Sequence, residues 1–180
     1  GQWWYYVDAH SGEVIFRYDN IQYACPGCTS GSNPTISGNR LAGEDGSVVS
    51  MPGRLEGTYY MTSCLDVWQV YDLDAFDCEQ NSNATWGTAD RAAVSAGKNF
   101  EDTQDWVMTV LGRDSFDDVH GWAQANVHEG SSYCNAYWDG SDFHFGDGYG
   151  PDYPATCLPL TVLDVAAHEY GHAVTQYTSN

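Results

Sequence analysis

A pair of histidines near the end of the chain constrains its local fold more than any other feature. The run His168-Glu169-Tyr170-Gly171-His172 places two imidazoles four residues apart. In an α-helix this spacing puts both side chains on one face, one turn apart, where their nitrogens can meet a single tetrahedral ion. We therefore expect a helix over residues 161–177, with Thr161 as its N-cap and Asp164 in its first turn, where a negative charge suits the helix dipole.

Glu169 follows the first histidine and lies about 100° further around such a helix, too far to be a natural third ligand. Its carboxylate is well placed to take a proton from a water that zinc activates, since zinc lowers the pKa of that water toward ~7. Standing alone, the same HExxH run could equally belong to an amphipathic helix with two surface histidines. Here small apolar residues surround it, and a Gly-rich loop leads into it. The sequence therefore favours a metal site.

The charge balance excludes some classes of partner. Lys and Arg number 6 against 25 Asp and Glu, a formal net charge of −19. A field of this sign repels nucleic-acid phosphates and anionic lipid, so we expect neither a nucleic-acid nor a membrane partner. Clustered carboxylates can also bind hard cations such as calcium, although a solvated acidic surface is the commoner role for any single one.

The chain has 6 cysteines, at positions 25, 28, 64, 78, 134 and 157. An even number favours disulfides and an oxidising compartment. We expect the pairs Cys25–Cys28, Cys64–Cys78 and Cys134–Cys157. The run Cys25-Pro-Gly-Cys28 could instead be a redox or zinc-binding CxxC. However, no second CxxC completes a four-ligand site, and Pro-Gly suits a tight local turn.

Apolar periodicity predicts an α+β domain rich in strands. Residues 3–21 form an expected hairpin, and the Pro-, Gly- and Ser-rich residues 25–46 resemble a linker and a loop-rich entry. Residues 48–86 contain short β-rich runs typical of an antiparallel or mixed sheet. One long helix is predicted over residues 88–111, where Gly112 would stop it. The remaining strands are expected at residues 121–127, 135–138 and 143–145, before the histidine-bearing helix.

Three runs in the second half carry a resemblance to a known family. They are Asn135-Ala136-Tyr137-Trp138-Asp139-Gly140, then Phe145-Gly146-Asp147-Gly148, then the segment from Asp164 to Thr175 that contains the two histidines. In order and spacing they resemble the thermolysin family of neutral metallopeptidases, which includes the bacillolysins, vibriolysins and pseudolysins. The family usually has threonine where this chain has Gly171.

The resemblance implies a role for each matching residue. His168 and His172 would be zinc ligands, and Glu169 the general base and acid. The edge strand at Asn135 and Ala136 would bind substrate through its backbone, with Asn135 adding a side-chain hydrogen bond. Asp164 matches a position that contributes to a calcium site in the family.

The resemblance also implies a division of the chain. Residues 1–24 resemble the hairpin that ends the family's propeptide, and residues 25–180 its N-terminal catalytic domain, which ends with the HExxH helix. The family's third zinc ligand is a glutamate on a later helix, in the helical domain that we expect to lie beyond this chain. His120, His128 and His144 have no spacing that points to the helix, so we expect them to be surface or strand histidines.

Two functions from different classes remain open. The first is a secreted zinc metalloendopeptidase acting on protein or peptide substrates, with efficient turnover only when the missing C-terminal domain or a complementing chain supplies the third ligand. The second is a catalytically silent structural or self-assembling extracellular module derived from the same family. The absent ligand, the expected disulfides and the aromatic β-rich ends would suit that second role.

Overall fold

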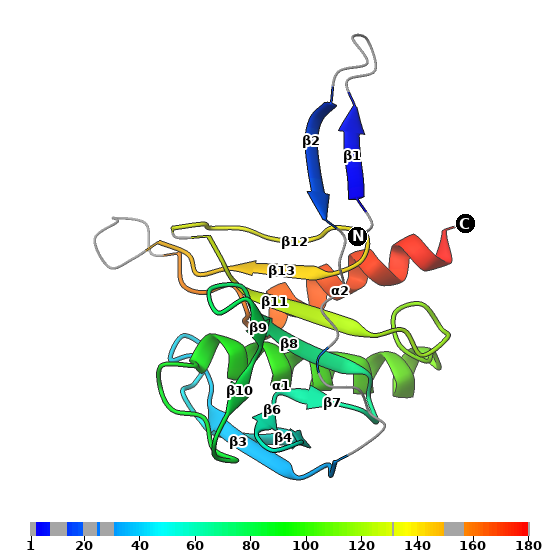
Figure 1. The fold of residues 1–180 in the computed structure, drawn as a ribbon. Coiled ribbons are helices and arrows are strands. Elements are labelled where there is room, and N and C mark those ends of the chain that lie inside the picture. Colours follow the sequence, from blue (N-terminus) through cyan, green and yellow to red (C-terminus); the bar gives the residue numbers. More distant parts are fainter. Residues whose placement is uncertain are drawn as a thin grey trace.

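The computed structural model describes residues 3–7, 14–19, 25, 31–130, 132–149 and 157–179. Short strands precede a long helix, further strands follow, and a second helix ends the described chain, which confirms the α+β class (Figure 1). The strands are β1 Trp3–Val7, β2 Val14–Asp19, β3 Thr35–Asn39, β4 Val48–Pro52, β5 Arg54–Leu55, β6 Tyr59–Tyr60, β7 Thr62–Ser63, β8 Trp68–Asp72, β9 Asp77–Cys78, β10 Gln80–Asn81, β11 Ala123–Glu129, β12 Ala136–Trp138 and β13 Phe143–Gly146. The helices are α1 Arg91–Trp106, continued by a π-helical turn Val107–Leu111, and α2 Leu163–Thr178.

A mixed sheet organises the domain, in the order β12-β13-β11-β8-β7, with β9 also paired to β8. Strand β11 runs parallel to both β8 and β13, whereas β12 pairs antiparallel with β13. The first five residues of β11 are all buried, as is typical of a parallel strand covered on both faces. Strand β12 lies at the edge, next to α2 (Figure 1).

Helix α1 packs on this sheet and confirms the helix predicted over residues 88–111, including its end at Gly112, which has a left-handed φ of 68°. Gly97 interrupts an otherwise good helical sequence, and packing explains it. A Cβ at this position would lie 3.0 Å from the sulfur atoms of both Met51 and Met61. The glycine therefore permits close packing of the helix on these two methionines.

Residues 25–46 contain more structure than the predicted linker. Strand β3 pairs antiparallel with β4, and Ile36 is only 1% exposed. A Cβ on Gly38 would lie 2.6 Å from a Val94 methyl group of α1, so the glycine permits close packing of this hairpin on the helix. The prediction missed β3 because a strand of small residues carries little periodic apolar signal.

The disulfides differ in part from the expected pairs. The Cys134–Cys157 bond is confirmed, but Cys25 pairs with Cys78, which overturns the local pairs Cys25–Cys28 and Cys64–Cys78. Cys25 is 4% exposed, and its backbone N–H donates to the Gln69 side chain of β8, so this residue is anchored on the sheet. Cys64 is also disulfide-bonded, and Cys28 lies outside the described residues.

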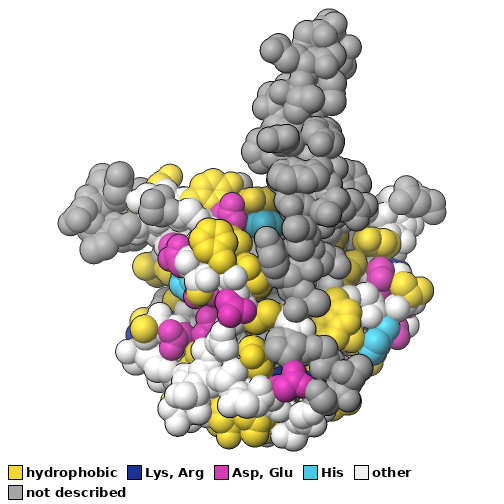
Figure 2. All heavy atoms as spheres, in the orientation of Figure 1, with side chains coloured by type: hydrophobic (Ala, Val, Ile, Leu, Met, Phe, Trp, Pro, Cys, Tyr) yellow, Lys and Arg dark blue, Asp and Glu magenta, His cyan; other side chains and the backbone are white. Residues whose placement is uncertain are grey.

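The predicted N-terminal hairpin is present as β1 and β2, which pair antiparallel and project from the rest of the molecule (Figure 1). Its expected turn lies outside the described residues. Figure 2 shows carboxylates spread over the visible face of the domain, with few Lys or Arg side chains among them. Within the described part of the chain, neither helix has the length and apolar character needed to cross a membrane.

Candidate functional site

Helix α2 carries the histidine pair and packs through one face against the aromatic core. Ala166, Tyr170 and Ala173 are at most 1% exposed, and the Tyr170 ring stacks on Phe143 of β13 with centroids 5.6 Å apart. The side chains of His168 and His172 lie on the exposed face. The spacing of four residues therefore places both histidines on one face of the helix, as the sequence predicts.

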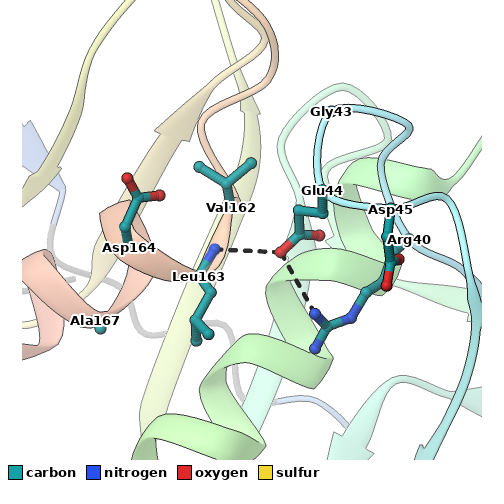
Figure 3. A pocket seen from close by; sticks show the side chains of 8 residues that line it. All are labelled: Arg40, Gly43, Glu44, Asp45, Val162, Leu163, Asp164 and Ala167. Carbon is teal, nitrogen blue, oxygen red and sulfur yellow. Dashed lines mark hydrogen bonds and ion pairs between the residues drawn. The ribbon is translucent and has the colours of Figure 1, made fainter.

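The N-terminus of α2 is held differently from the prediction. Val162 occupies the N-cap position and makes no side-chain cap, so the expected Thr161 cap is wrong. The Glu44 carboxylate instead accepts the backbone N–H of Leu163 at 3.2 Å (Figure 3). The Asn99 amide donates to the Thr161 carbonyl at 2.7 Å. A carboxylate from a distant loop thus accepts the hydrogen bond of a helix N–H group that a local N-cap side chain would otherwise accept.

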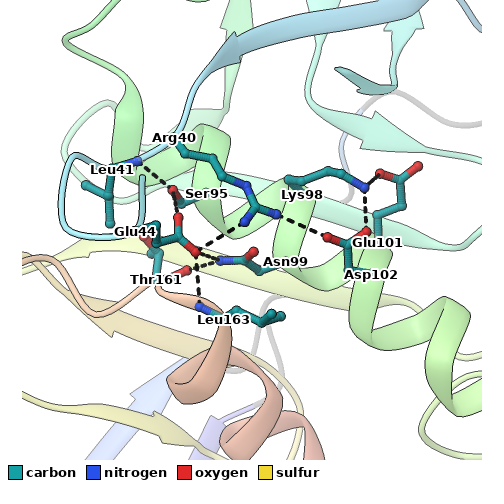
Figure 4. Close-up of polar contacts among 10 residues, drawn as sticks. All are labelled: Arg40, Leu41, Glu44, Ser95, Lys98, Asn99, Glu101, Asp102, Thr161 and Leu163. Carbon is teal, nitrogen blue, oxygen red and sulfur yellow. Dashed lines mark hydrogen bonds and ion pairs between the residues drawn. The ribbon is translucent and has the colours of Figure 1, made fainter. Parts of the chain in front are cut away.

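Glu44 belongs to a wider polar network (Figure 4). Its oxygens also accept the Ser95 hydroxyl at 2.6 Å and the Asn99 amide at 2.9 Å, both from α1. The Arg40 guanidinium lies 3.7 Å from the same carboxylate and pairs with Asp102 at 3.1 Å. The network therefore joins the loop after β3, helix α1 and the start of α2.

The two histidines converge on one point. Their Nε2 atoms lie 3.1 Å apart. Two ligands of a tetrahedral zinc with Zn–N bonds of ~2.0–2.1 Å are separated by about 3.3 Å. The pair could thus hold such an ion with only a small movement. Within the described ranges, no third His, Cys, Asp or Glu forms a three-ligand cluster with them.

Glu169 faces the edge strand. Its side chain is largely buried, and its Oε2 accepts the backbone N–H of Trp138 in β12 at 3.1 Å. A pocket of about 410 Å³ lies beside it, lined by Cys134, Asn135, Ala136, Leu160, Asp164, Val165, His168 and Glu169. The structure therefore brings together five of the six predicted site residues around one hollow, with His172 beside His168 on the same helix face.

Asp164 also borders a second hollow, of about 590 Å³, at the start of α2 (Figure 3). Glu44 and Asp45 line this hollow too. Among the described residues, Asp164 is not part of any three-ligand cluster. Its calcium role stays a prediction.

A histidine on β13 supports the edge strand. His144 Nδ1 lies 2.9 Å from Glu129 and Nε2 lies 3.4 Å from Asp139. Burial opposes a charge on His144, but these two carboxylates outweigh it and raise its pKa to about 9. The Tyr137 ring stacks on the imidazole at 4.7 Å, and its hydroxyl donates to Glu129. The charged imidazole therefore fastens β12 to its neighbours.

His120 and His128 also lie away from the pair on α2. His120 is exposed in a loop and pairs with Asp114, and His128 lies in β11 and pairs with Asp147. Sequence reasoning missed Glu44, Asn99, Glu129 and Asp139 as supports of the site. No local signal marks the first three, because Glu44, Asn99 and Glu129 act on partners in other segments. Asp139 acts on His144 within the β12–β13 hairpin, and nothing in the sequence of that hairpin singles it out.

Comparisons with known proteins agree with this geometry. The family described as "Thermolysin metallopeptidase, catalytic domain" matches residues 38–176. A bacillolysin of Brevibacillus brevis is 31% identical over 189 residues, which cover 99% of this chain and 32% of the relative. A thermolysin of Alicyclobacillus acidocaldarius is 29% identical over 191 residues, covering 99% of this chain and 34% of the relative.

A solved structure is similar as well. The precursor of protealysin, a metalloproteinase from Serratia proteamaculans, superposes with a TM-score of 0.51 at 26% identity, covering 61% of this chain and 34% of that one. The chain spans about a third of the length of the two curated relatives. The family match covers most of its residues and includes the histidine-bearing helix. The chain belongs to the thermolysin family of metallopeptidases.

Proposed function

We propose that this chain is the part of a secreted zinc metalloendopeptidase that binds the metal through two histidines, carries the catalytic base and pairs with the substrate. One observation carries the proposal. The Nε2 atoms of His168 and His172 lie 3.1 Å apart on the helix that also directs Glu169 toward the edge strand. Family membership supports the same chemistry.

Zinc held by His168 and His172 would supply Lewis acidity that activates a water and polarises the peptide carbonyl. Glu169 would accept the proton of that water on its carboxylate and later pass it to the leaving amine. Its Oε2 already accepts a hydrogen bond from Trp138, which fixes the carboxylate beside the edge strand. The proton transfer would use the other oxygen, Oε1.

The substrate would lie along β12. Among the described strands, β12 pairs with β13 alone, and the pocket that includes Asn135 and Ala136 lies next to Glu169 and His168. An extended peptide can add to such an edge through backbone hydrogen bonds. The substrates would thus be proteins or peptides. Cleavage beside a bulky apolar residue would follow the preference of the thermolysin family.

The third zinc ligand would be a carboxylate from a further domain or a complementing chain. Residues 1–24 would act as a propeptide-derived hairpin, and residues 25–180 as the N-terminal catalytic domain. The bonds Cys25–Cys78 and Cys134–Cys157 favour an oxidising, extracellular environment. Calcium bound at Asp164 is part of the same proposal.

The test reconstitutes the chain with a C-terminal domain from a family relative, then measures zinc stoichiometry and cleavage of a blocked peptide. We expect His168→Ala to lose one zinc equivalent and all cleavage. Glu169→Gln should keep that zinc and lower cleavage by about 10²–10⁴-fold, the usual contribution of a general base. His120→Gln is the matched control, because this exposed histidine lies in a loop outside the site. Unchanged zinc stoichiometry in His168→Ala would refute the proposal and favour a catalytically silent module.

A further inference from the structure

A second group of metal-ligating side chains lies away from the histidine pair. Asp74, His128 and Asp147 each offer one ligand atom, and these atoms lie within 4.8 Å of one another. In the described part of the chain this is the one group of three such residues. No step of the proposed peptidase chemistry uses it.

The topology of the sheet explains why these residues meet. Strands β8, β11 and β13 are parallel, so their carboxyl ends lie at the same edge of the sheet. Asp74 follows β8, His128 lies near the end of β11, and Asp147 follows β13 directly. Crevices at the carboxyl ends of parallel strands are frequent places for ligand sites.

An irregularity in β11 accompanies the cluster. The pairing of β11 with β13 shifts between Asn126 and Glu129, and His128 within this shift has a left-handed φ of 62°. Such bulges change the direction of a side chain relative to the regular alternation. Here the imidazole Nδ1 lies 2.8 Å and 3.1 Å from the two oxygens of Asp147, and Asp74 contributes a further carboxylate.

We propose that Asp74, His128 and Asp147 bind a divalent transition-metal ion that joins the carboxyl ends of the three parallel strands. One imidazole nitrogen and two carboxylates suit zinc or a similar ion, because calcium and magnesium prefer oxygen ligands alone. Water would complete the coordination, since Asp74 is exposed. The nearby charge of Asp72 adds to the attraction for a cation.

Two other histidines of this chain show what a simple ion pair looks like. His120 Nδ1 lies 2.8 Å from Asp114, also at a left-handed φ, yet no third ligand among the described residues joins this pair. At His144 the carboxylates of Glu129 and Asp139 face opposite ring nitrogens, so one ion cannot reach all three groups. The ligand atoms of Asp74, His128 and Asp147 differ because all three lie within 4.8 Å of one another.

The experiment uses the full chain with His168→Ala and His172→Ala, so that zinc at the α2 pair cannot contribute. Equilibrium dialysis with zinc alone should show one equivalent bound to this double variant. Adding His128→Gln, Asp74→Asn or Asp147→Asn should weaken binding at least about tenfold, whereas adding His120→Gln should leave it unchanged. Circular dichroism and the disulfide content check that each variant is folded.

A second measurement keeps the proposal testable if a variant fails to fold. In NMR spectra of imidazole nitrogens of the double variant, zinc should shift the His128 signals and leave those of His120 in place. Calcium at the same concentration should shift neither. Absence of zinc binding to the double variant, or binding that His128→Gln does not weaken, would overturn the proposal. Either result leaves the proposed peptidase function untouched.

Discussion

Replacing Glu44 by alanine should loosen the start of the histidine-bearing helix. The Glu44 side chain is 9% exposed, and its carboxylate accepts hydrogen bonds from Ser95, Asn99 and the backbone of Leu163. The substitution removes all of these acceptors at once. Leu163 is the first residue of α2, so the loss acts directly on the helix that carries His168 and His172.

The expected loss in free energy of unfolding depends on whether each donor that bonds Glu44 can find another acceptor. A hydrogen bond to a charged group contributes about 1.5–3 kcal/mol, but donors that can reach water recover part of this. Leu163 is 43% exposed, so its N–H can be hydrated, whereas the Asn99 amide is buried. Arg40 keeps its pair with Asp102. We therefore expect a net loss of about 2–4 kcal/mol, and a smaller loss for Glu44→Gln, which keeps an acceptor oxygen.

For a domain of this size, about 3 kcal/mol corresponds to a fall in Tm of about 6–12 °C. Thermal unfolding followed by circular dichroism, with disulfides intact, measures this fall. Hydrogen exchange at the first turn of α2 should rise in parallel. Asp45→Ala is the matched control, because this exposed neighbour bonds the Ser47 backbone and side chain and not the start of α2, and the Tm of this variant should not change. If Glu44→Ala unfolds at the same temperature as Asp45→Ala, the assigned role of the network is wrong.

Two further predictions concern the edge strand. Because the folded pKa of His144 is raised from 6.5 to about 9 by Asp139 and Glu129 against the effect of burial, its contribution to stability should be complete below about pH 6.5 and disappear as the pH rises through about 9. His144→Gln should remove that alkaline loss in pH-dependent unfolding, and an unchanged pH profile would contradict the assignment. Replacing Cys134 and Cys157 together by serine should lower the free energy of unfolding by about 3 kcal/mol, as expected for a loop of this length, in denaturant titrations. A double variant as stable as the wild type would show that this bond does not constrain the unfolded chain.

Local patterns in the sequence predicted the elements that hold the site. The spacing of His168 and His172 determines their relative position, because a helix repeats every 3.6 residues whatever surrounds it. The alternation around Phe143 likewise depends on strand β13 alone, and the glycine at position 112 on the end of the first helix alone. These predictions needed no knowledge of the path of the chain.

The contacts that hold these elements together were not predictable in the same way. Glu44 meets Leu163 across 119 positions, and Cys25 meets Cys78 across 53. Such pairs depend on the path of the whole chain. Many carboxylates could accept the Leu163 N–H, and several cysteines could pair with Cys25. The sequence also suggested Thr161 as a helix cap, because threonine is a common N-cap residue. In the structure the carboxylate of the distant Glu44 accepts the first N–H of the helix instead.

The bond between Cys25 and Cys78 has a consequence for proteolysis. It attaches residue 25 covalently to β9, so a cut upstream of this cysteine releases the preceding peptide and leaves the rest crosslinked. A cut between residues 25 and 78, by contrast, releases nothing unless a reductant is present. The disulfide thus divides the first half of the chain into a segment that a protease can detach and one that it can only nick.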